Sequence, residues 1–507
     1  MTQIHEIEQS SIEANGLGIL KGLYAWIQEN ADTVEAHEAE RHILDRVLAV
    51  GLAAVEDYFA QKGTGDVGPI LVHEDGLEYH RHGQIQRKAY ISIFGKSRIE
   101  RTGYHAPGRP MVFPLDAEAN LPERRFSYPL QDLVNDFGMN GPFVDAMKRL
   151  KKWRGDGVWD HSAEQISRDS AEDYTLYYET KPAPEAAPPE EYLIASVDGK
   201  GVPMIKSESA KIQGKLKKGE KRLKKKEALV GACCTVAPNV RTAEDVAESL
   251  VYPERAQARR KANRGERDAN PKPRDIRRLA SLKPKDVVIQ ELVREAEKRD
   301  PNHERGLALL MDGDRGLERL TLEAFQAWPR EQVHVILDII HVREYLWAAA
   351  HALHGDGSDA AATWVYKQLV KILQGSVGYV IGSLKSSLTK RGLRGGKAEA
   401  LCDAIRYFTN HAHMMQYDVY LAWGFPIATG IVESACKSLV KNRMEGCGMR
   451  WSIPGAEAML RLRSLYLSGD WEDYTTFRID QERARRYGTI LRMLRANGSR
   501  QPLRKAG

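Results

Sequence analysis

The sequence contains few cysteines and no long apolar run. Its five cysteines are odd in number and scattered, and none of them forms a Cys-x-x-Cys pair. This disfavours a disulfide scaffold or a zinc ribbon and predicts a reduced, cytoplasmic protein. No apolar run approaches the roughly 18 residues of a transmembrane helix. The first residues also lack the basic and apolar regions of a signal peptide, so we expect no membrane partner.

The chain has 507 residues, which is too long for one hydrophobic core and predicts two to four domains. Its net charge is only +6, but the basic residues are unevenly spread. Residues 206–226 carry ten Lys and Arg against two Glu. Such a run is often a solvated face, yet one placed between two strands is typical of arms that follow nucleic-acid phosphates. We interpret a second basic stretch, residues 255–278, as a partly disordered insertion on the nucleic-acid side.

The first third of the chain shows helical and then strand-like patterns. Residues 17–62 are predicted to form helices whose apolar stripe packs on a neighbour or on a second copy of the chain. The stripe consists of Ala36, Ile43, Leu44, Val47, Leu48, Leu52, Val55 and Phe59. Residues 86–95 and 97–105 alternate between apolar and polar and predict a β-hairpin.

Residues 128–178 predict three helices separated by a short turn and by Gly155-Asp-Gly157. This order is typical of a helix-turn-helix. Basic residues nearby make DNA binding an interpretation to test: Lys148, Arg149, Lys151, Lys152 and Arg154. A plain three-helix bundle with a solvated basic face is the alternative.

A proline-rich segment then separates two kinds of sequence. Residues 181–190 contain four prolines and predict an extended linker. Beyond it, residues 192–198 form an apolar run that ends in Asp198-Gly199, and residues 202–205 and 227–236 predict two further strands. An Asp-Gly pair by itself is also a common hairpin turn.

The same pattern of an apolar strand ending in an acid recurs downstream. Residues 306–313 end in Asp312-Gly313, and residues 333–338 end in Asp338 with His341 three positions later. Glu433 lies early in a predicted helix. In parallel α/β sheets, active sites gather at the carboxyl ends of strands. Converging carboxylates suit Mg²⁺ or Mn²⁺, and two such ions roughly 3.5–4 Å apart catalyse phosphoryl transfer. The residues therefore predict a metal-dependent enzyme that acts on nucleic-acid phosphodiesters.

Several motifs then carry a resemblance to a known family. They are Ser196-Val-Asp-Gly-Lys200, Leu310-Met-Asp-Gly313, Leu337-Asp-Ile-Ile-His-Val-Arg-Glu344, Gly430-Ile-Val-Glu-Ser-Ala-Cys-Lys437 and Arg443-Met-Glu-Gly-Cys-Gly-Met-Arg-Trp-Ser452. With these motifs the chain resembles the DDE transposases of bacterial insertion sequences, of the ISKra type, with a motif layout similar to that of Mutator-like transposases. The resemblance covers roughly residues 190–470 and is most specific in the last two motifs.

The resemblance implies an α/β, RNase H-like catalytic domain with a helical insertion before the last acid. The 121-residue interval between Asp312 and Glu433 (433 minus 312) fits such an insertion. Asp198, Asp312 and Glu433 would hold Mg²⁺, with Mn²⁺ as a substitute, and Asp338 and His341 would form an auxiliary motif. Asp338 is the alternative to Asp312 as second metal ligand, and Asp314 is a weaker competitor.

The expected DNA contacts are basic residues near these acids or in the basic arm. They are Lys200, Lys437, Arg443, Lys217, Lys218, Lys224 and Lys225. Lys437 could instead pair with Glu433, and we expect Trp451 to be a packing residue. A satisfied histidine beneath the sheet is the alternative interpretation of His341.

The expected organisation is a mainly helical DNA-binding region followed by the catalytic core. Its parts are residues 1–125 (helices with a β-hairpin), 126–180 (helix-turn-helix-like domain), 181–190 (linker), 191–341 (catalytic core, first part), 342–425 (helical insertion), 426–470 (last core helix with Glu433) and 471–507 (basic tail).

The expected activity is cleavage of insertion-sequence ends and their joining to target DNA. The partners would be the terminal inverted repeats, the target DNA and further copies of the chain in a homodimer or higher oligomer, in the bacterial cytoplasm or on the nucleoid. The alternatives are a related nuclease or resolvase that does not join strands, and a domesticated transposase that only binds DNA.

Overall fold

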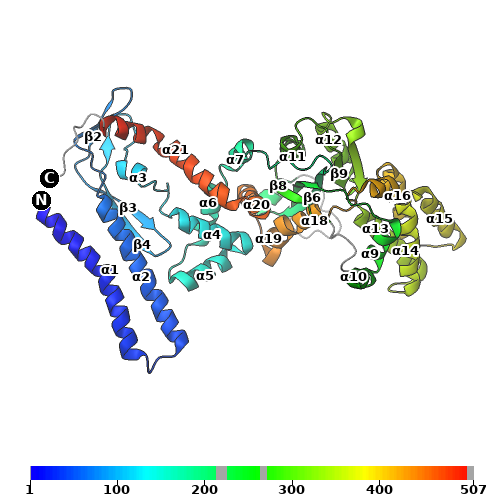
Figure 1. The fold of residues 1–507 in the computed structure, drawn as a ribbon, viewed down its shortest axis with the longest axis horizontal. Helices are drawn as coiled ribbons and strands as arrows, with labels where there is room; N and C mark the ends of the chain where they lie inside the picture. Colours follow the sequence, from blue (N-terminus) through cyan, green and yellow to red (C-terminus); the bar gives the residue numbers. More distant parts are fainter. Residues whose placement is uncertain (1, 213–224, 263–270, 499–507) are drawn as a thin grey trace. The chain divides into compact units, whose positions relative to one another are not determined.

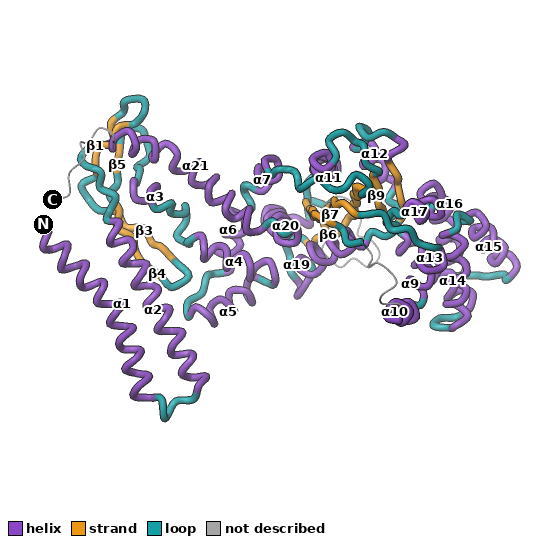
Figure 2. The backbone as a smooth tube through the Cα atoms, in the orientation of Figure 1, coloured by secondary structure: helices purple, strands orange, loops and turns teal. Residues whose placement is uncertain are grey.

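The computed structural model describes residues 2–212, 225–262 and 271–498, and it divides the chain into two compact units. The first unit combines residues 1–179 with residues 471–507, and the second comprises residues 180–470. Helices and strands occur in both units, coloured by type in Figure 2. Among the described residues, no helix is long and apolar enough to cross a lipid bilayer.

The first unit begins with two long helices that lie antiparallel to each other (Figure 1). They are α1 (Thr2–Asn30) and α2 (Ala36–Lys62). The predicted β-hairpin is confirmed: β3 (Gln86–Ile91) pairs antiparallel with β4 (Lys96–Arg101). A Cβ atom on Gly51 of α2 would lie 2.4 Å from the ring of Phe94 in the hairpin turn, so a residue without a side chain allows this close approach.

The remaining elements of the first unit are short strands and a helical bundle. The short strands β1 (Ile70–Val72), β2 (Glu78–Arg81) and β5 (Tyr104–His105) form a small antiparallel sheet. After α3 (Pro114–Glu118) come α4 (Tyr128–Asn140), α5 (Phe143–Arg154), α6 (Asp160–Ser170) and α7 (Tyr174–Thr180). The predicted helices of residues 128–178 are therefore present, and α4, α5 and α6 pack around a core that includes Leu130, Val134, Met147, Leu150 and Ile166.

The prediction that the C-terminal residues form a basic tail is wrong for residues 471–498. Residues 471–498 form a long helix, α21 (Trp471–Gly498), that belongs to the first unit. Tyr474, Tyr487 and Met493 of this helix are buried, and the Tyr487 hydroxyl donates to the carbonyl of Leu121 at 2.6 Å. The apolar residues between the arginines thus make α21 a core element of the first unit.

The second unit is built on one mixed five-stranded sheet in the order β10-β9-β6-β7-β8. Its strands are β6 (Tyr192–Pro203), β7 (Lys225–Val236), β8 (Arg274–Ser281), β9 (Leu307–Met311) and β10 (Val333–Leu337). β6, β9 and β10 are mutually parallel, whereas β7 is antiparallel to both β6 and β8. The expected α/β class is confirmed, but the sheet is mixed rather than wholly parallel.

Two sequence predictions about these strands are corrected. β6 does not end at Asp198, because it pairs with β7 without a break from Tyr192 to Pro203. The stretch 255–278 is also more ordered than expected. It contains α10 (Pro253–Ala262) and the edge strand β8, in which Arg277 is buried, while residues 263–270 lie outside the described part. β6 and β8 both pair with β7, and these contacts between residues far apart in the sequence explain why both strands differ from the prediction.

Helices cover the sheet and extend beyond its β10 edge. They are α8 (Lys206–Ser209), α9 (Ala243–Val251), α11 (Lys285–Arg299), α12 (Arg315–Ala324), α13 (Ile339–His354), α14 (Asp359–Leu373), α15 (Val377–Lys390), α16 (Gly396–His411), α17 (Tyr417–Trp423), α18 (Gly430–Ala435), α19 (Asn442–Met444) and α20 (Ile453–Ser468). Shorter turns are η1 (Arg330–Gln332), η2 (Ala412–Met414) and η4 (Gly446–Gly448), and η3 (Cys436–Lys441) is a π-helix.

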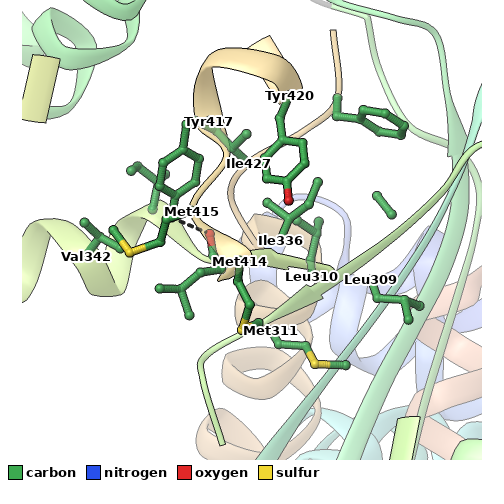
Figure 3. Packing of buried hydrophobic residues seen from close by; sticks show 14 of the residues in the cluster. Leu309, Leu310, Met311, Ile336, Val342, Met414, Met415, Tyr417, Tyr420 and Ile427 are labelled. Atoms are coloured by element: carbon green, nitrogen blue, oxygen red, sulfur yellow. Dashed lines mark hydrogen bonds between the residues drawn. The ribbon is translucent and has the colours of Figure 1, made fainter. Parts of the chain in front are cut away.

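The helices from α13 to α17 share one core with the sheet. Figure 3 shows Tyr417 and Tyr420 packed with Ile336 and Leu310 of the parallel strands. The Tyr417 hydroxyl donates to the carbonyl of Leu337 at 2.8 Å. The helical segment is therefore anchored at the strand ends where the candidate site lies.

Candidate active site

The register of the parallel strands places three aspartates level with one another. Ser196 of β6 is opposite Leu310 of β9, so Asp198 and Asp312 stand at the same level two residues further on. Leu337 is opposite Met311, which puts Asp338 next to Asp312. Asp312 and Asp338 are the first residues after β9 and β10, so the three acids lie where the pairing of the parallel strands ends. Asp198 lies inside β6, but the pairing of β6 with β9 ends at Ser196, so Asp198 lies beyond the paired part of these two strands.

Asp198 carries an unfavourable negative charge. Burial raises the pKa of its carboxyl, and the nearby charge of Asp312 raises it further. The Cys436 thiol donates to Oδ2 of Asp198 at 3.1 Å, and Lys200 lies close enough for its charge to favour the ionised form. The net pKa of Asp198 nevertheless stays above its usual value. A cation bound between Asp198 and Asp312 would therefore lower the free energy needed to ionise Asp198.

Asp312 is held by the turn that follows β9. Its Oδ1 accepts the backbone N–H of Asp314 at 3.0 Å, and its carbonyl accepts the Tyr407 hydroxyl of α16 at 2.7 Å. Gly313 has a φ of 96°, which favours glycine, and its carbonyl lies 2.8 Å from Nε2 of His411. The helical segment therefore fixes the position of Asp312 through two side chains of α16.

Asp338 occupies a structural position. It is 1% exposed and caps the N-terminus of α13, where one carboxylate oxygen accepts the N–H of Ile340 at 2.8 Å. The Thr429 hydroxyl donates to the other oxygen. Because both oxygens are engaged, the geometry favours Asp312 over Asp338 as the partner of Asp198. Asp314 is likewise a helix cap, because it accepts the N–H of Leu317 at 2.8 Å.

His341 does not lie beneath the sheet. Its side chain is 42% exposed, and its Nδ1 lies 3.2 Å from the carboxylate of Glu344. The interpretation of His341 as a satisfied core histidine is therefore wrong, and its ring contacts Glu344 rather than the Asp338 cap.

Glu433 lies on the short helix α18, which contacts the strands β6 and β7. It is exposed, and it precedes Cys436, the residue that touches Asp198, by three positions. The chain passes from α18 directly into the π-helix η3 at Cys436, and such π segments are frequent at functional sites. Within residues 2–212, 225–262 and 271–498, however, no group of three His, Cys, Asp or Glu side chains is placed to hold a metal ion. The expected set of Asp198, Asp312 and Glu433 is thus not assembled as three ligands in this structure.

The basic residues expected to contact DNA lie in different environments. Lys200 lies near Asp198, and Lys437 is exposed on η3. Among the residues described, no ion pair joins Lys437 to Glu433, and Lys225 pairs with Glu445 at 3.1 Å. The expected contacts Lys217, Lys218 and Lys224 lie outside the described residues.

Arg443 is not available as a phosphate contact. It is 2% exposed, its guanidinium lies 4.7 Å from the ring centre of Trp451, and Nη1 is 2.9 Å from the Met449 sulfur. Burial, with a smaller contribution from the charge of Arg463, lowers the pKa of Arg443 to about 9. Trp451 is a packing residue, as expected, and its Nε1 donates to the carbonyl of Met444 at 3.0 Å. The motif from Arg443 to Trp451 therefore packs and stabilises the segment that follows η3 in the chain.

Sequence reasoning missed four residues that shape the site. They are Cys436, Tyr407, His411 and Thr429, which contact Asp198, the Asp312 turn or Asp338. Cys436 had a detectable signal, since it shares a helix face with Glu433 three residues earlier. The other three are far from their partners in the sequence: Tyr407 is 95 positions from Asp312, His411 is 98 from Gly313, and Thr429 is 91 from Asp338. No local pattern marks them.

A second surface of interest lies on α5 in the first unit. Lys148, Arg149, Lys151 and Lys152 are all exposed there, and Trp153 beside them is 65% exposed. Arg154, which we expected among these contacts, is instead buried, and its Nε donates to the carbonyl of Ser92 at 3.1 Å. Four of the five predicted basic residues thus form a solvent-facing surface.

Comparisons with known proteins add no assignment. No protein-family model matches the chain, and no curated protein matches it. The function must therefore be inferred from the site.

Proposed function

We propose that this chain is a DDE-type DNA transposase with an RNase H-like catalytic unit. The observation that carries the proposal is the pair formed by Asp198 and Asp312, level on adjacent parallel strands, one of them with a raised pKa. The mixed α/β sheet supports it, because β6, β9 and β10 run parallel and Asp198 and Asp312 lie toward the carboxyl ends of these strands, where active sites of such sheets gather. The helical segment between Asp312 and Glu433 also agrees with the interrupted core of this family.

The donor set fits a hard divalent cation at the aspartate pair. Asp198 and Asp312 would hold Mg²⁺ or Mn²⁺, with Glu433 as the candidate third ligand brought by a movement of α18, and the ion would stabilise charge on the phosphodiester during in-line displacement. The Cys436 thiol, whose own pKa is raised by burial and by Asp198, stays protonated and orients the Asp198 carboxylate. Tyr407 and His411 keep Asp312 in place. Lys200 and Lys437 would contact phosphates of the bound strand.

The reaction would occur twice in the same site. In the first step, water attacks the phosphorus of a phosphodiester at the element end and the P–O3′ bond breaks. The water loses a proton to solvent and the leaving 3′-oxygen takes one up, so that the strand ends in a 3′-hydroxyl. In the second step, this hydroxyl attacks a phosphodiester of target DNA and displaces a target 3′-oxygen, so that one bond forms for each that breaks. The basic face of α5 would contribute to binding of the DNA ends through phosphate contacts.

The test is a cleavage and strand-transfer assay on DNA that carries the native element ends, with Mg²⁺, Mn²⁺ or EDTA. We expect Asp198→Asn and Asp312→Asn each to lower joining by at least roughly 100-fold, because each removes a negative ligand at the transition state. Glu433→Gln should have a similar effect. Asp338→Asn is the matched control, since asparagine also caps helices, and it should retain joining.

Each other outcome assigns a different function. Loss of joining in Asp338→Asn with full activity in Asp312→Asn would move the second ligand to Asp338. Metal-dependent cutting without joining would identify a nuclease or resolvase. Specific DNA binding without either reaction would leave a DNA-binding protein.

A further inference from the structure

Among the residues whose side chains the structure describes, the hairpin of α1 and α2 carries exposed apolar side chains on one face. Between Gly16 and Asn30, α1 contains only two charged residues, Lys21 and Glu29, yet it packs against α2 as its main partner. Leu17, Leu20 and Tyr24 follow one another at intervals of three and four residues and are 58%, 37% and 63% exposed. A helix so poor in charge is normally covered on more than one side.

α2 carries a matching stripe. Ile43, Val47, Val50, Ala54 and Tyr58 recur at intervals of four, three, four and four residues, and Val47 and Tyr58 are each 50% exposed. The contact to α1 uses a different side of α2, where His42 stacks on Trp26 with ring centres 3.9 Å apart and Ala53 is buried. At 100° per residue, the stripes of both helices point to the same side of the antiparallel hairpin. Alternating intervals of three and four residues are the spacing by which helices pack on other helices.

The charges beside the α2 stripe fit an antiparallel copy of the same helix. Arg46 and Asp57 lie along one flank, and Glu40 and Lys62 lie along the other. The position numbers in each pair add to almost the same value, 103 and 102, so a two-fold axis near Gly51 brings Arg46 opposite Asp57 and Glu40 opposite Lys62 of a second copy. A two-fold axis forms each pair twice. Arg46 and Asp57 are eleven positions apart in the helix (57 minus 46), a separation of roughly 16 Å, which is too far for a contact within one chain.

We propose that the chain forms a homodimer in which two α1–α2 hairpins pack face to face into an antiparallel four-helix bundle. In this dimer the α2 stripes of the two copies meet across the two-fold axis, and the exposed residues of α1 are covered at the same interface. The dimer forms without DNA and does not depend on the transposase assignment.

The first experiment measures the mass of the full chain in solution without DNA, by sedimentation velocity and by light scattering. Wild type is expected to be a dimer. Val47→Glu should weaken dimerisation by at least roughly 100-fold, because it places two charges in an apolar interface. Val144→Glu is the matched control: Val144 is a helical valine of similar exposure, 47%, in the same unit, and this variant should remain dimeric. Circular dichroism should show both variants folded.

A charge exchange tests the register. Arg46→Glu and Asp57→Arg should each weaken the dimer by roughly tenfold, because each replaces two attractive pairs by two repulsive ones. The double variant should recover most of the wild-type affinity, which a contact within one chain cannot explain. A monomeric wild type, a Val47→Glu variant that dimerises like wild type, or a double variant no tighter than the singles would overturn the proposal.

Discussion

At the scale of single residues, Asp198 shows how a functional site can cost stability. Burial and the Asp312 carboxylate raise the pKa of Asp198, so the folded chain binds this proton more tightly than the unfolded chain does. Its contribution to folding stability therefore falls as the pH rises from the ordinary carboxyl pKa, about 3.9, through the raised value. Above that value the ionised carboxyl opposes folding.

Asp198→Asn should accordingly stabilise the metal-free protein at neutral pH. We expect a gain of about 1 kcal/mol at pH 7–8, the order of magnitude of a single stabilising substitution, because the uncharged amide removes the repulsion with Asp312. The gain should shrink as the pH falls through the raised pKa of Asp198, because the wild-type carboxyl then becomes protonated. Urea unfolding in EDTA at several pH values measures it, with Asp480→Asn as an exposed control. A gain independent of pH would show that ionisation of Asp198 is not its cause.

Residue types alone did not separate site residues from structural ones. Asp198, Asp312 and Asp338 follow the same apolar-strand pattern, yet Asp338 is a buried cap and Asp198 faces a second carboxylate. Arg443 resembles a phosphate contact in the sequence and is buried against Trp451. The difference depends on partners such as Thr429, which is 91 positions away from Asp338 in the sequence. No local sequence pattern reveals such a partner.

At the scale of secondary-structure elements, the cap of α13 links the strand β10 to the helical segment. Asp338→Ala should destabilise the second unit by about 1–2 kcal/mol, because it removes the cap and leaves the buried Thr429 hydroxyl without this acceptor. Asp338→Asn should cost less, since asparagine also caps helices. Denaturant unfolding followed by tryptophan fluorescence provides the measurement. Equal losses for alanine and asparagine would contradict the capping role.

The elements with strong local patterns were predictable. The strands predicted after residues 306 and 333 and the hairpin formed by β3 and β4 occur as expected, because their apolar spacing and turn residues agree with their environment. The failures share another cause. β6 runs through Asp198-Gly199 to Pro203, and β8 forms within a basic stretch, because both pair with the buried strand β7.

At the scale of the whole molecule, the first unit is assembled from both ends of the sequence. Residues 471–498 resemble a basic tail because their arginines dominate the composition, yet several of these arginines pair with acids of the N-terminal segment. Arg485 contacts Asp173 at 2.5 Å, and Arg486 contacts Glu123 at 3.1 Å. On the same helix, the Tyr474 hydroxyl donates to the carbonyl of Ser170 at 2.6 Å. Composition could not show this arrangement, because it depends on contacts more than 300 residues apart.

This arrangement predicts the behaviour of a chain cut once between the units. Residues 181–190 form no helix or strand, and Glu185 and Ala186 are exposed, whereas Arg305 binds the carbonyl of Ala187 at 2.5 Å. A specific protease site inserted between Glu185 and Ala186 would separate the covalent chain into residues 1–185 and 186–507. The two fragments should still elute together in size-exclusion chromatography, because α21 of the second fragment completes the core of the first unit.

A matched variant of the cut protein identifies α21 as the connection. Tyr474→Ala together with Tyr487→Ala removes two buried rings and their hydrogen bonds, at a cost of about 3–5 kcal/mol for each large aromatic side chain. After cleavage this double variant should separate into two fragments, while Tyr466→Ala, a change at an exposed tyrosine of α20, should not. Immediate separation of the cut wild-type fragments would mean that α21 does not hold the first unit together, and the C-terminal residues would then be a tail after all.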